Sequence, residues 1–181
     1  MLRVTGISTI RRNNIPAMNT PPSNMSREAF ISTFGSLYEH SPWVAERVFD
    51  AGPQDSPEQL HGAFRGAVLN SDRNAQLRLL RAHPELACSQ AGLSGASRGE
   101  QAGAGLDACS QAEFDELREL NQRYQERFGF PFIVAVRGLD RHQILSLFRQ
   151  RIEHDADLEF GQALEQVCQI GRHRLMGYFN A

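Results

Sequence analysis

Apolar residues recur every three or four positions along most of the chain from residue 26 onward. Two of these stripes are Phe30, Phe34, Leu37 and Tyr38, and Leu60, Phe64 and Val68. This spacing is typical of amphipathic helices, which bury one face against their neighbours. The pattern predicts an all-α fold, with about seven or eight helices in a single compact domain.

Capping residues indicate where these helices begin and end. Ser41–Pro42 and Ser56–Pro57 each combine an N-cap with a proline at the first helical position. We expect the helix that Ser71 or Asp72 opens to end at His83, because Pro84 disfavours helical dihedrals in the residue before it. Further predicted N-caps are Ser97 with Glu100, Ser110 with Glu113, Asp140, and Asp155.

Residues 130–136, "FPFIVAV", form an apolar run that is too short for a helix. Pro131 and the lack of a plausible partner strand favour a buried, partly extended connection over a sheet. Its backbone N–H and C=O groups must then find other partners. A planar, amide-rich ligand could form these hydrogen bonds, and so could side chains of the core.

Residues 1–25 differ from the rest, since they hold three arginines, three prolines and no acidic residue. An organelle-targeting peptide has this composition. We expect instead a disordered extension, or a start assigned too early with Met25 as the effective start. The all-helical domain is then expected over residues 26–181.

Charge and composition exclude several functions. The net charge is −2 with no basic run, which argues against nucleic acid or an anionic membrane as a partner. No apolar run approaches the ~20 residues of a membrane span. All 19 basic residues are arginine, so no lysine is available for a Schiff base. The three cysteines, Cys88, Cys109 and Cys168, lack metal-ligand spacing, and we expect reduced thiols in an intracellular protein.

Besides residues 130–136, three positions could carry chemistry. His83 stands at a helix end where Pro84 fixes the turn, so it could be a placed acid or base, or a histidine bonded to its own helix. Arg174 follows Val167 and Ile170 on an apolar stripe, where either an internal carboxylate or a substrate anion must meet it. The segment "SRGEQ", residues 97–101, offers hydroxyl, carboxylate and amide groups, or only a helix cap. The other histidines, expected to be solvated, are His40, His61, His142, His154 and His173.

The order of these motifs resembles one enzyme family. "RAHPELA", "SRGEQAGAGL", "LNQRYQERFGFPFIVAVRG" and "EQVCQIGRHRL" are similar to the decarboxylases of 2-oxo-4-hydroxy-4-carboxy-5-ureidoimidazoline (OHCU), which act late in urate degradation. The resemblance covers residues 26–178 and implies a helical, often homodimeric protein. It also implies that the enzyme needs neither a cofactor nor a metal and releases (S)-allantoin and carbon dioxide.

The resemblance assigns roles to individual positions. His83 and Glu100 match the catalytic residues of the family. The positions that match its substrate-binding residues are Pro84, Ser97, Arg98, Gly99, Gln101, Phe132, Ile133, Val134, Ala135, Val136 and Arg174. The substrate carries a C=N bond next to the carbon that loses its carboxylate, so it can accept the electron pair without lysine or a metal.

Two other readings remain. A helical binding module could grip a peptide or a planar ligand, and a hydrolase of 5-hydroxyisourate could use the same scaffold. The order of the motifs argues against the hydrolase. The arginine-only composition indicates a GC-rich genome, so we expect a bacterial cytoplasm, and the C-terminus "YFNA" is not a peroxisomal signal.

Overall fold

The computed structural model describes residues 20–86 and 94–180, and within them the protein is helical. The elements in chain order are η1 (Pro22–Asn24), α1 (Arg27–Phe34), α2 (Trp43–Asp50), α3 (Pro57–Leu69), α4 (Arg73–Arg81), α5 (Gly95–Gly103), η2 (Leu106–Ala108), α6 (Gln111–Phe128), α7 (Arg141–Arg151) and α8 (Ala156–Phe179). The eight α-helices in this part of the chain confirm the predicted all-α fold and its single domain.

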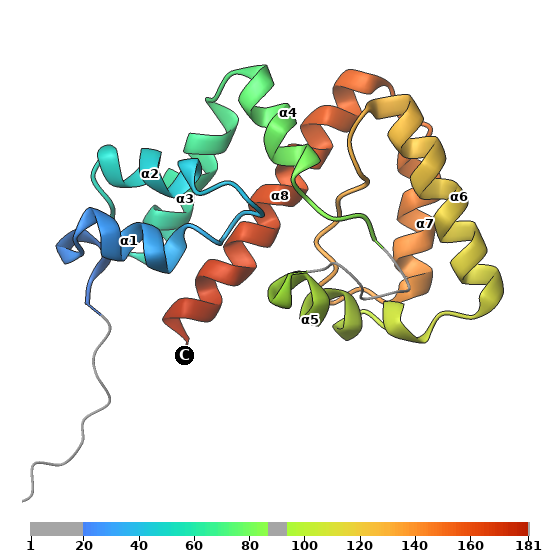
Figure 1. The fold of residues 1–181 in the computed structure, drawn as a ribbon, viewed down its shortest axis with the longest axis horizontal. Helices are drawn as coiled ribbons and strands as arrows, with labels where there is room; N and C mark the ends of the chain where they lie inside the picture. Colours follow the sequence, from blue (N-terminus) through green and yellow to red (C-terminus); the bar gives the residue numbers. More distant parts are fainter. Residues whose placement is uncertain (1–19, 87–93, 181) are drawn as a thin grey trace, which may run out of the picture.

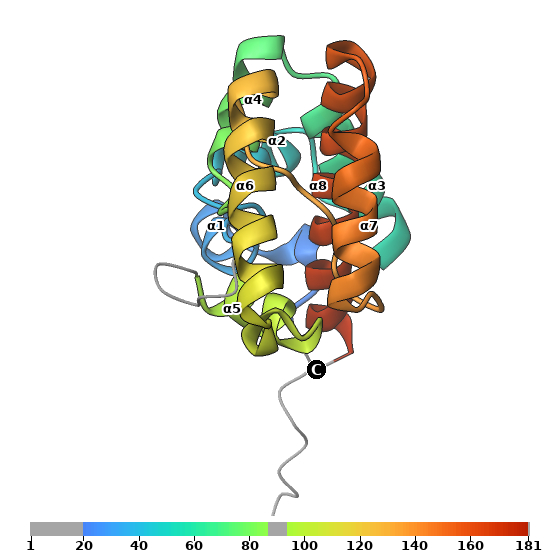
Figure 2. The ribbon, with the colours of Figure 1, turned by 90° about the vertical axis from the view of Figure 1, so that its right-hand side faces the viewer.

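The long helix α8 connects two groups of helices (Figure 1). Helices α1, α2 and α3 pack on one end of α8, with α3 in extensive contact with it. Helices α6 and α7 lie beside its other end, and the second view shows these helices side by side (Figure 2). α4 contacts α8 between the two groups.

Each group has its own aromatic cluster. Phe30 and Phe34 meet Phe64 of α3 at ring-centroid distances of 6.2 and 6.1 Å. On the other side, Phe132 stacks on Phe148 with centroids 3.9 Å apart, and Tyr124 meets both rings edge-on. All these rings are buried, so each cluster holds its own group of helices together.

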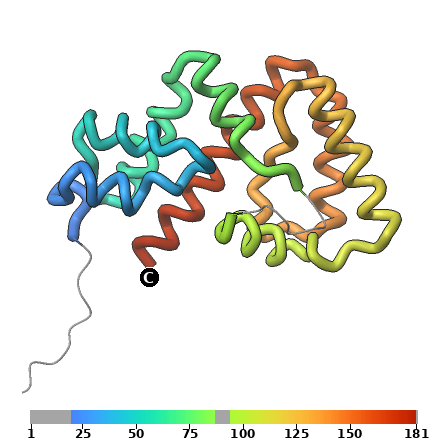
Figure 3. The backbone as a smooth tube through the Cα atoms, in the orientation of Figure 1, coloured from blue at the N-terminus to red at the C-terminus, as the bar shows by residue number. Residues whose placement is uncertain are grey.

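The connection between α6 and α7 is extended and not a strand, as the sequence predicted. It starts after Gly129, whose φ of +74° ends α6 in the left-handed conformation that glycine tolerates. The backbone trace shows it crossing the interior of the molecule (Figure 3). Phe130, Phe132, Ile133, Val134 and Val136 are all buried.

Most predicted caps are confirmed. The side chains of Ser56, Asp72 and Asp155 accept from backbone N–H groups of their helices, and complete capping boxes form at Ser110 and at Asp140. The caps of α2, α4 and α5 differ from the prediction.

α2 begins at Trp43, with Pro42 at the cap, one residue later than predicted. α4 ends at Arg81, two residues before the predicted His83, because the chain tightens after it: the His83 N–H donates to the Leu80 carbonyl, three residues back, at 3.2 Å. The cap of α5 is Ser94, so the predicted cap at Ser97 is wrong. The hydroxyl of Ser97 donates to the Glu39 carboxylate, 2.6 Å away.

The cysteines are not all reduced. Cys168 is free and buried, but Cys109 is disulfide-bonded, so the prediction of three thiols is wrong for this residue. Cysteine spacing carries no pairing information, which is why the sequence could not reveal the bond. Cys88 lies outside the described residues.

Residues 1–19 of the expected extension also lie outside the described part, and its boundary at residue 26 stays a prediction. In η1, Ser23 donates from its backbone N–H and its hydroxyl to Asp55, at 2.8 and 2.7 Å. None of the helices in the described part is both long and apolar enough to cross a membrane.

Candidate active site

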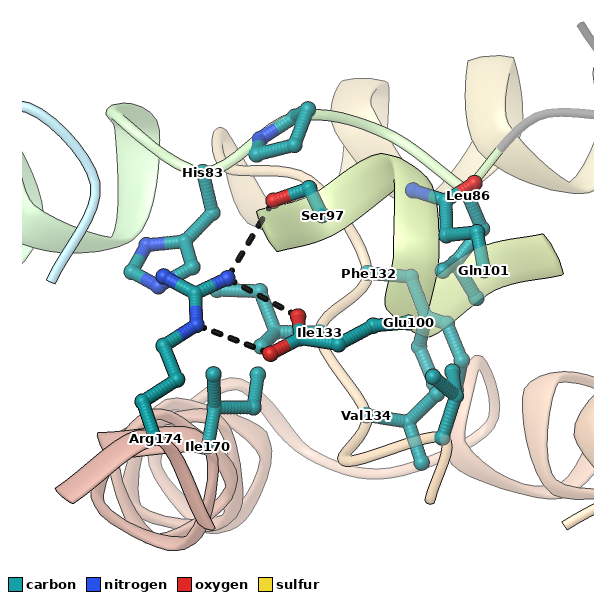
Figure 4. A pocket seen from close by; sticks show the side chains of 12 residues that line it. His83, Leu86, Ser97, Glu100, Gln101, Phe132, Ile133, Val134, Ile170 and Arg174 are labelled. Carbon is teal, nitrogen blue, oxygen red and sulfur yellow. Dashed lines mark hydrogen bonds and ion pairs between the residues drawn. The ribbon is translucent and has the colours of Figure 1, made fainter. Parts of the chain in front are cut away.

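A pocket of about 360 Å³ lies where the end of α4, α5, α8 and the connection between α6 and α7 meet. Four sequence segments that are far apart in the chain contribute to it, as Figure 4 shows. The residues that line it are His83, Pro84, Leu86, Ser97, Glu100, Gln101, Phe132, Ile133, Val134, Val136, Ile170 and Arg174.

His83 is buried at the end of α4, and its two ring nitrogens have different surroundings. Nδ1 lies 2.9 Å from the carbonyl oxygen of Leu79, one turn earlier, and donates its proton to it. Nε2 is buried and has no hydrogen-bond partner among the described residues. The bond of His83 to its own helix is therefore confirmed, and the other ring nitrogen is available for a ligand.

The environment of His83 favours the neutral imidazole. Burial lowers its pKa below the ordinary value of 6.5, and the charge of Arg174 acts in the same direction. The Leu79 carbonyl and the nearby carboxylates of Glu39 and Glu100 oppose this without reversing it. With Nδ1 protonated, Nε2 carries the lone pair, and His83 can take up a proton near pH 7.

The segment after His83 is held by amide side chains. Gln101 Nε2 donates to the Glu85 carbonyl at 3.2 Å, and Asn121 Nδ2 donates to the Leu86 carbonyl at 2.7 Å. Pro84 restricts the backbone in between. His83 is thus fixed from its own helix and, beyond it, from α5 and α6.

Arg174 projects from α8 between two carboxylates. Its Nε and Nη2 each donate to Glu100 at 2.8 Å in a bidentate pair, and Nη2 also lies 3.1 Å from Glu39 Oε1. Nη1 donates to the Leu37 carbonyl at 3.2 Å. The alternative in which internal carboxylates meet Arg174 is therefore confirmed. In Figure 4 the guanidinium lies between the His83 ring and Glu100.

Glu39 is buried at the centre of this cluster, and no sequence pattern predicted it. Ser94 and Ser97 donate to its Oε1 at 2.9 and 2.6 Å. Burial alone would raise the pKa of Glu39, but these hydrogen bonds and the charge of Arg174 lower it below its ordinary value. Glu39 is thus ionised at neutral pH. No motif marks it, because a glutamate in a loop before Ser41–Pro42 is indistinguishable from a solvated one.

Two peptide groups of the buried connection form hydrogen bonds with side chains. Arg151 Nη1 donates to the Ile133 carbonyl at 2.8 Å, and the Ala135 N–H donates to Gln166 Oε1 at 2.9 Å. In a trans peptide the C=O and N–H point in opposite directions. The Val134 N–H therefore points away from Arg151, and the Val134 C=O points away from Gln166. Neither group has a hydrogen-bond partner among the described residues.

Arg151 is itself fixed by a buried ionic network. Its guanidinium pairs with Glu159, which also accepts from Tyr124 and from His154 Nδ1, and it stacks 4.6 Å from the centroid of Phe132. Arg151 and Glu159 are nearly inaccessible to solvent. His154 was expected to be solvated, and this contact shows that expectation to be wrong.

Most of the predicted site residues line this pocket or the cavity next to it. Gly99 and Ala135 line the neighbouring cavity, and Arg98 is exposed and is not among the residues that line either one. The residues that the prediction missed are Glu39, Leu86, Gln166 and Ile170. Ile170 and Gln166 share the inward side of α8 with Arg174, so helical periodicity could have found them.

The neighbouring cavity, of about 670 Å³, shares five residues with the pocket. The shared residues are Glu100, Val134, Val136, Ile170 and Arg174. Arg137 and His173 line the cavity only. Within residues 20–86 and 94–180, no group of three or more His, Cys, Asp or Glu side chains is placed to hold a metal ion.

Comparisons with known proteins agree on one family. The family model "OHCU decarboxylase" matches residues 23–176. A 2-oxo-4-hydroxy-4-carboxy-5-ureidoimidazoline decarboxylase of Haloferax volcanii is 39% identical over 88% of this chain and 94% of its own length. The uric acid degradation bifunctional protein PucL of Bacillus subtilis is 39% identical over 84% of this chain and 31% of its own.

The fold agrees with these sequence matches. The crystal structure of an (S)-allantoin synthase superposes with a TM-score of 0.69 at 33% identity, covering 86% of this chain and 52% of that one. The family model spans nearly all of the described residues, and the pocket lies inside the matched region. The chain belongs to the OHCU decarboxylase family.

Proposed function

We propose that this protein decarboxylates OHCU to (S)-allantoin and carbon dioxide, with His83 as the proton-transferring residue. The observation that carries the proposal is the buried, unpartnered Nε2 of His83 in a pocket with the Glu100–Arg174 pair. Membership of the family and the name of the relative that is 39% identical support the choice of substrate.

The chemistry of the substrate defines what the protein must do. When the C–COO⁻ bond breaks, its electron pair forms a double bond to the neighbouring ureido carbon. The C=N pair then moves onto the ring nitrogen, which takes a proton from the solvent. The product of this step is an enol. Its hydroxyl must lose a proton and the ureido carbon must gain one to give allantoin.

His83 is suited to the second half of this reaction. As a neutral imidazole it takes the proton from the hydroxyl at Nε2, while its Nδ1–H remains bonded to Leu79. The resulting imidazolium donates a proton to the ureido carbon. Because the ring is fixed by α4 and Pro84, the proton arrives on one face only, and one enantiomer results.

Glu100 and Arg174 orient the substrate in this proposal. Arg174 holds both oxygens of Glu100, which leaves their remaining lone pairs for the substrate hydroxyl or ureido N–H. Arg174 has one N–H on Nη1 beyond the bond to Leu37, and this group would meet a carbonyl or anionic part of the substrate. Binding roles for Pro84, Ser97, Arg98, Gly99 and Gln101 stay predictions.

The segment from Phe132 to Val136 would bind the ring amides. Val134 offers an N–H and a C=O that no described residue occupies, and Val134 lines both cavities. A cyclic amide presents a donor and an acceptor side by side, so these two groups complement such an edge. Arg151 and Gln166 hold the peptides that carry them.

Further parts of the proposal rest on the chemistry and on the family resemblance. The C=N bond of the substrate is its own electron sink, so we propose a reaction without cofactor or metal. We also propose a homodimer in a bacterial cytoplasm. Analytical ultracentrifugation of the purified chain tests the assembly.

The activity is tested with OHCU generated in situ from urate, followed by the optical activity of the product. The parent protein should give (S)-allantoin rapidly, whereas His83→Ala and Glu100→Gln should approach the uncatalysed, racemic background. His142→Ala, at an exposed histidine on α7, is the matched control and should keep the parent rate. Parental turnover by His83→Ala would overturn the assignment of His83.

A further inference from the structure

The ionic cluster at the wall of the pocket carries an excess of negative charge. Glu100 and Arg174 line the pocket, and Glu39 does not line it but bonds to Arg174, so two carboxylates share one guanidinium. His83 is neutral because burial lowers its pKa. The cluster of Glu39, Glu100 and Arg174 therefore has a formal charge of −1, although the proposed substrate carries a carboxylate. Repulsion there favours loss of the carboxylate as neutral CO2, but it opposes binding.

A cation with no ion-pair or hydrogen-bond partner in the described part of the chain lies at the adjoining cavity. Arg137 is exposed and lines this cavity with Glu100, His173 and Arg174. Its guanidinium makes no ion pair or hydrogen bond with the residues that the structure describes. Arg137 is therefore available to bind an anion, whereas Arg174 is already neutralised.

The backbone places Arg137 at a fixed corner. The Leu139 N–H donates to the Val136 carbonyl at 3.0 Å and closes a turn around Arg137 and Gly138. Gly138 has a φ of +85°, a conformation that favours glycine in such a turn. Arg137 thus follows directly after the segment that lines the pocket, and it stands at the rim of the cavity that adjoins it.

The other basic residues that line the cavity, His173 and Arg174, do not supply an unpaired positive charge in place of Arg137. Burial lowers the pKa of His173, and the positive charges of Arg137 and Arg172 lower it further, while Glu100 opposes the shift. His173 is consequently neutral near pH 7, and its Nε2 lies 3.1 Å from Gln169 Nε2. Of the cations that line the cavity, Arg174 is neutralised and Arg137 is not.

We propose that Arg137 is an anion-binding residue that captures small carboxylates at the outer cavity, before they enter the negatively charged pocket. The proposal rests on the proposed decarboxylation, for which it names the residue that recognises the charge of the substrate. An exposed guanidinium attracts an anion most strongly at low ionic strength, and salt screens this attraction. Arg137 is accordingly expected to act on substrate capture and not on the bond-breaking step.

The test compares the parent with Arg137→Gln, Arg137→Lys and the control Arg118→Gln, which removes one exposed arginine from α6 outside both cavities. Decarboxylation rates are measured at several ionic strengths. Arg137→Gln should raise KM about 3- to 10-fold at low salt, change kcat less than twofold and weaken the salt dependence of kcat/KM. Arg137→Lys should restore most of the loss, because it keeps the charge.

A second measurement uses two ligands that differ in charge. Allantoate carries a carboxylate, whereas allantoin is neutral, and the binding of each to the resting protein is followed by calorimetry. Arg137→Gln should weaken allantoate binding and leave allantoin binding unchanged. If Arg137→Gln matches Arg118→Gln in KM, salt dependence and allantoate binding, Arg137 has no such role. A parent protein that fails to turn over OHCU would instead overturn the proposed function, and the allantoate measurement would still decide on Arg137.

Discussion

Glu39 and Arg174 are 135 positions apart in the sequence, and their side chains lie 3.1 Å apart in a salt bridge. Both side chains are largely buried, at 7% and 11% exposure. Ser94 and Ser97 at the start of α5 donate to the same carboxylate. Glu39 therefore connects the loop after α1 to α5 and α8, the helices that carry Glu100 and Arg174.

Replacing Glu39 with glutamine should reduce both stability and activity. The variant keeps the size of the side chain but leaves the guanidinium with one carboxylate fewer. We expect a loss of about 1–3 kcal/mol in the free energy of unfolding, the range for a buried polar group that loses its partner. We also expect a lower kcat, because Arg174 is free to shift relative to Glu100. Urea denaturation and steady-state kinetics measure the two effects, with the exposed Glu58→Gln as control. Unchanged values for both would show that Glu39 is dispensable.

The pH dependence of the reaction should report His83. The reaction needs neutral His83, whose pKa lies below 6.5 because the ring is buried. Activity should thus be constant above pH 6.5 and fall only at more acidic pH, as Nε2 takes up a proton. The charge of Glu39 raises this pKa, so Glu39→Gln should move the acidic limb to still lower pH. A limb above pH 6.5 in the parent would contradict this role.

The same lowered pKa has a consequence for stability. The folded state binds a proton at His83 less readily than the unfolded chain does. The contribution of His83 to stability is therefore complete above pH 6.5 and is lost as the pH falls from 6.5 toward the pKa in the folded state. Chemical denaturation between pH 5 and 8 measures this change, and His83→Asn should reduce it.

Local signals in the sequence predicted the helices and much of the pocket. Caps such as Ser56 and Ser110 act within one helical turn, so the residues that make them are neighbours in the sequence. The motifs around His83 and Glu100 could likewise be matched to a family. Glu39 could not be found in this way, and helical periodicity puts Gln166 on the inward side of α8 without showing its bond to Ala135. Their roles arise from contacts at separations of 135 and 31 residues, which no local pattern encodes.

Gln166 should affect substrate binding through the backbone. Its Oε1 accepts from the Ala135 N–H and so sets the direction of the peptide whose C=O belongs to Val134. Gln166→Met removes the acceptor at similar size and should raise KM about 3- to 10-fold, the cost of about 1 kcal/mol for one hydrogen bond. Gln166→Glu keeps an acceptor and should recover most of the affinity. If the two variants have equal KM, the hydrogen bond to Ala135 does not act on the substrate.

The Tyr38 ring packs closely against α8 at Gly171. A Cβ built on Gly171 would lie 2.6 Å from Cζ and Oη of Tyr38, and the Tyr38 ring is itself buried. Gly171→Ala must therefore displace the ring or the helix, and we expect a loss of about 1–3 kcal/mol from overpacking.

The matched control is Gly161→Ala on the same helix, where a Cβ meets nothing within 4 Å. That substitution should be neutral or stabilise the protein by up to about 1 kcal/mol through helix propensity. Because Arg174 lies one turn beyond Gly171, a shift of α8 should also lower the activity of Gly171→Ala, while Gly161→Ala keeps it. Thermal denaturation and turnover assays compare the two variants. If Gly171→Ala is as stable and as active as Gly161→Ala, this account is contradicted.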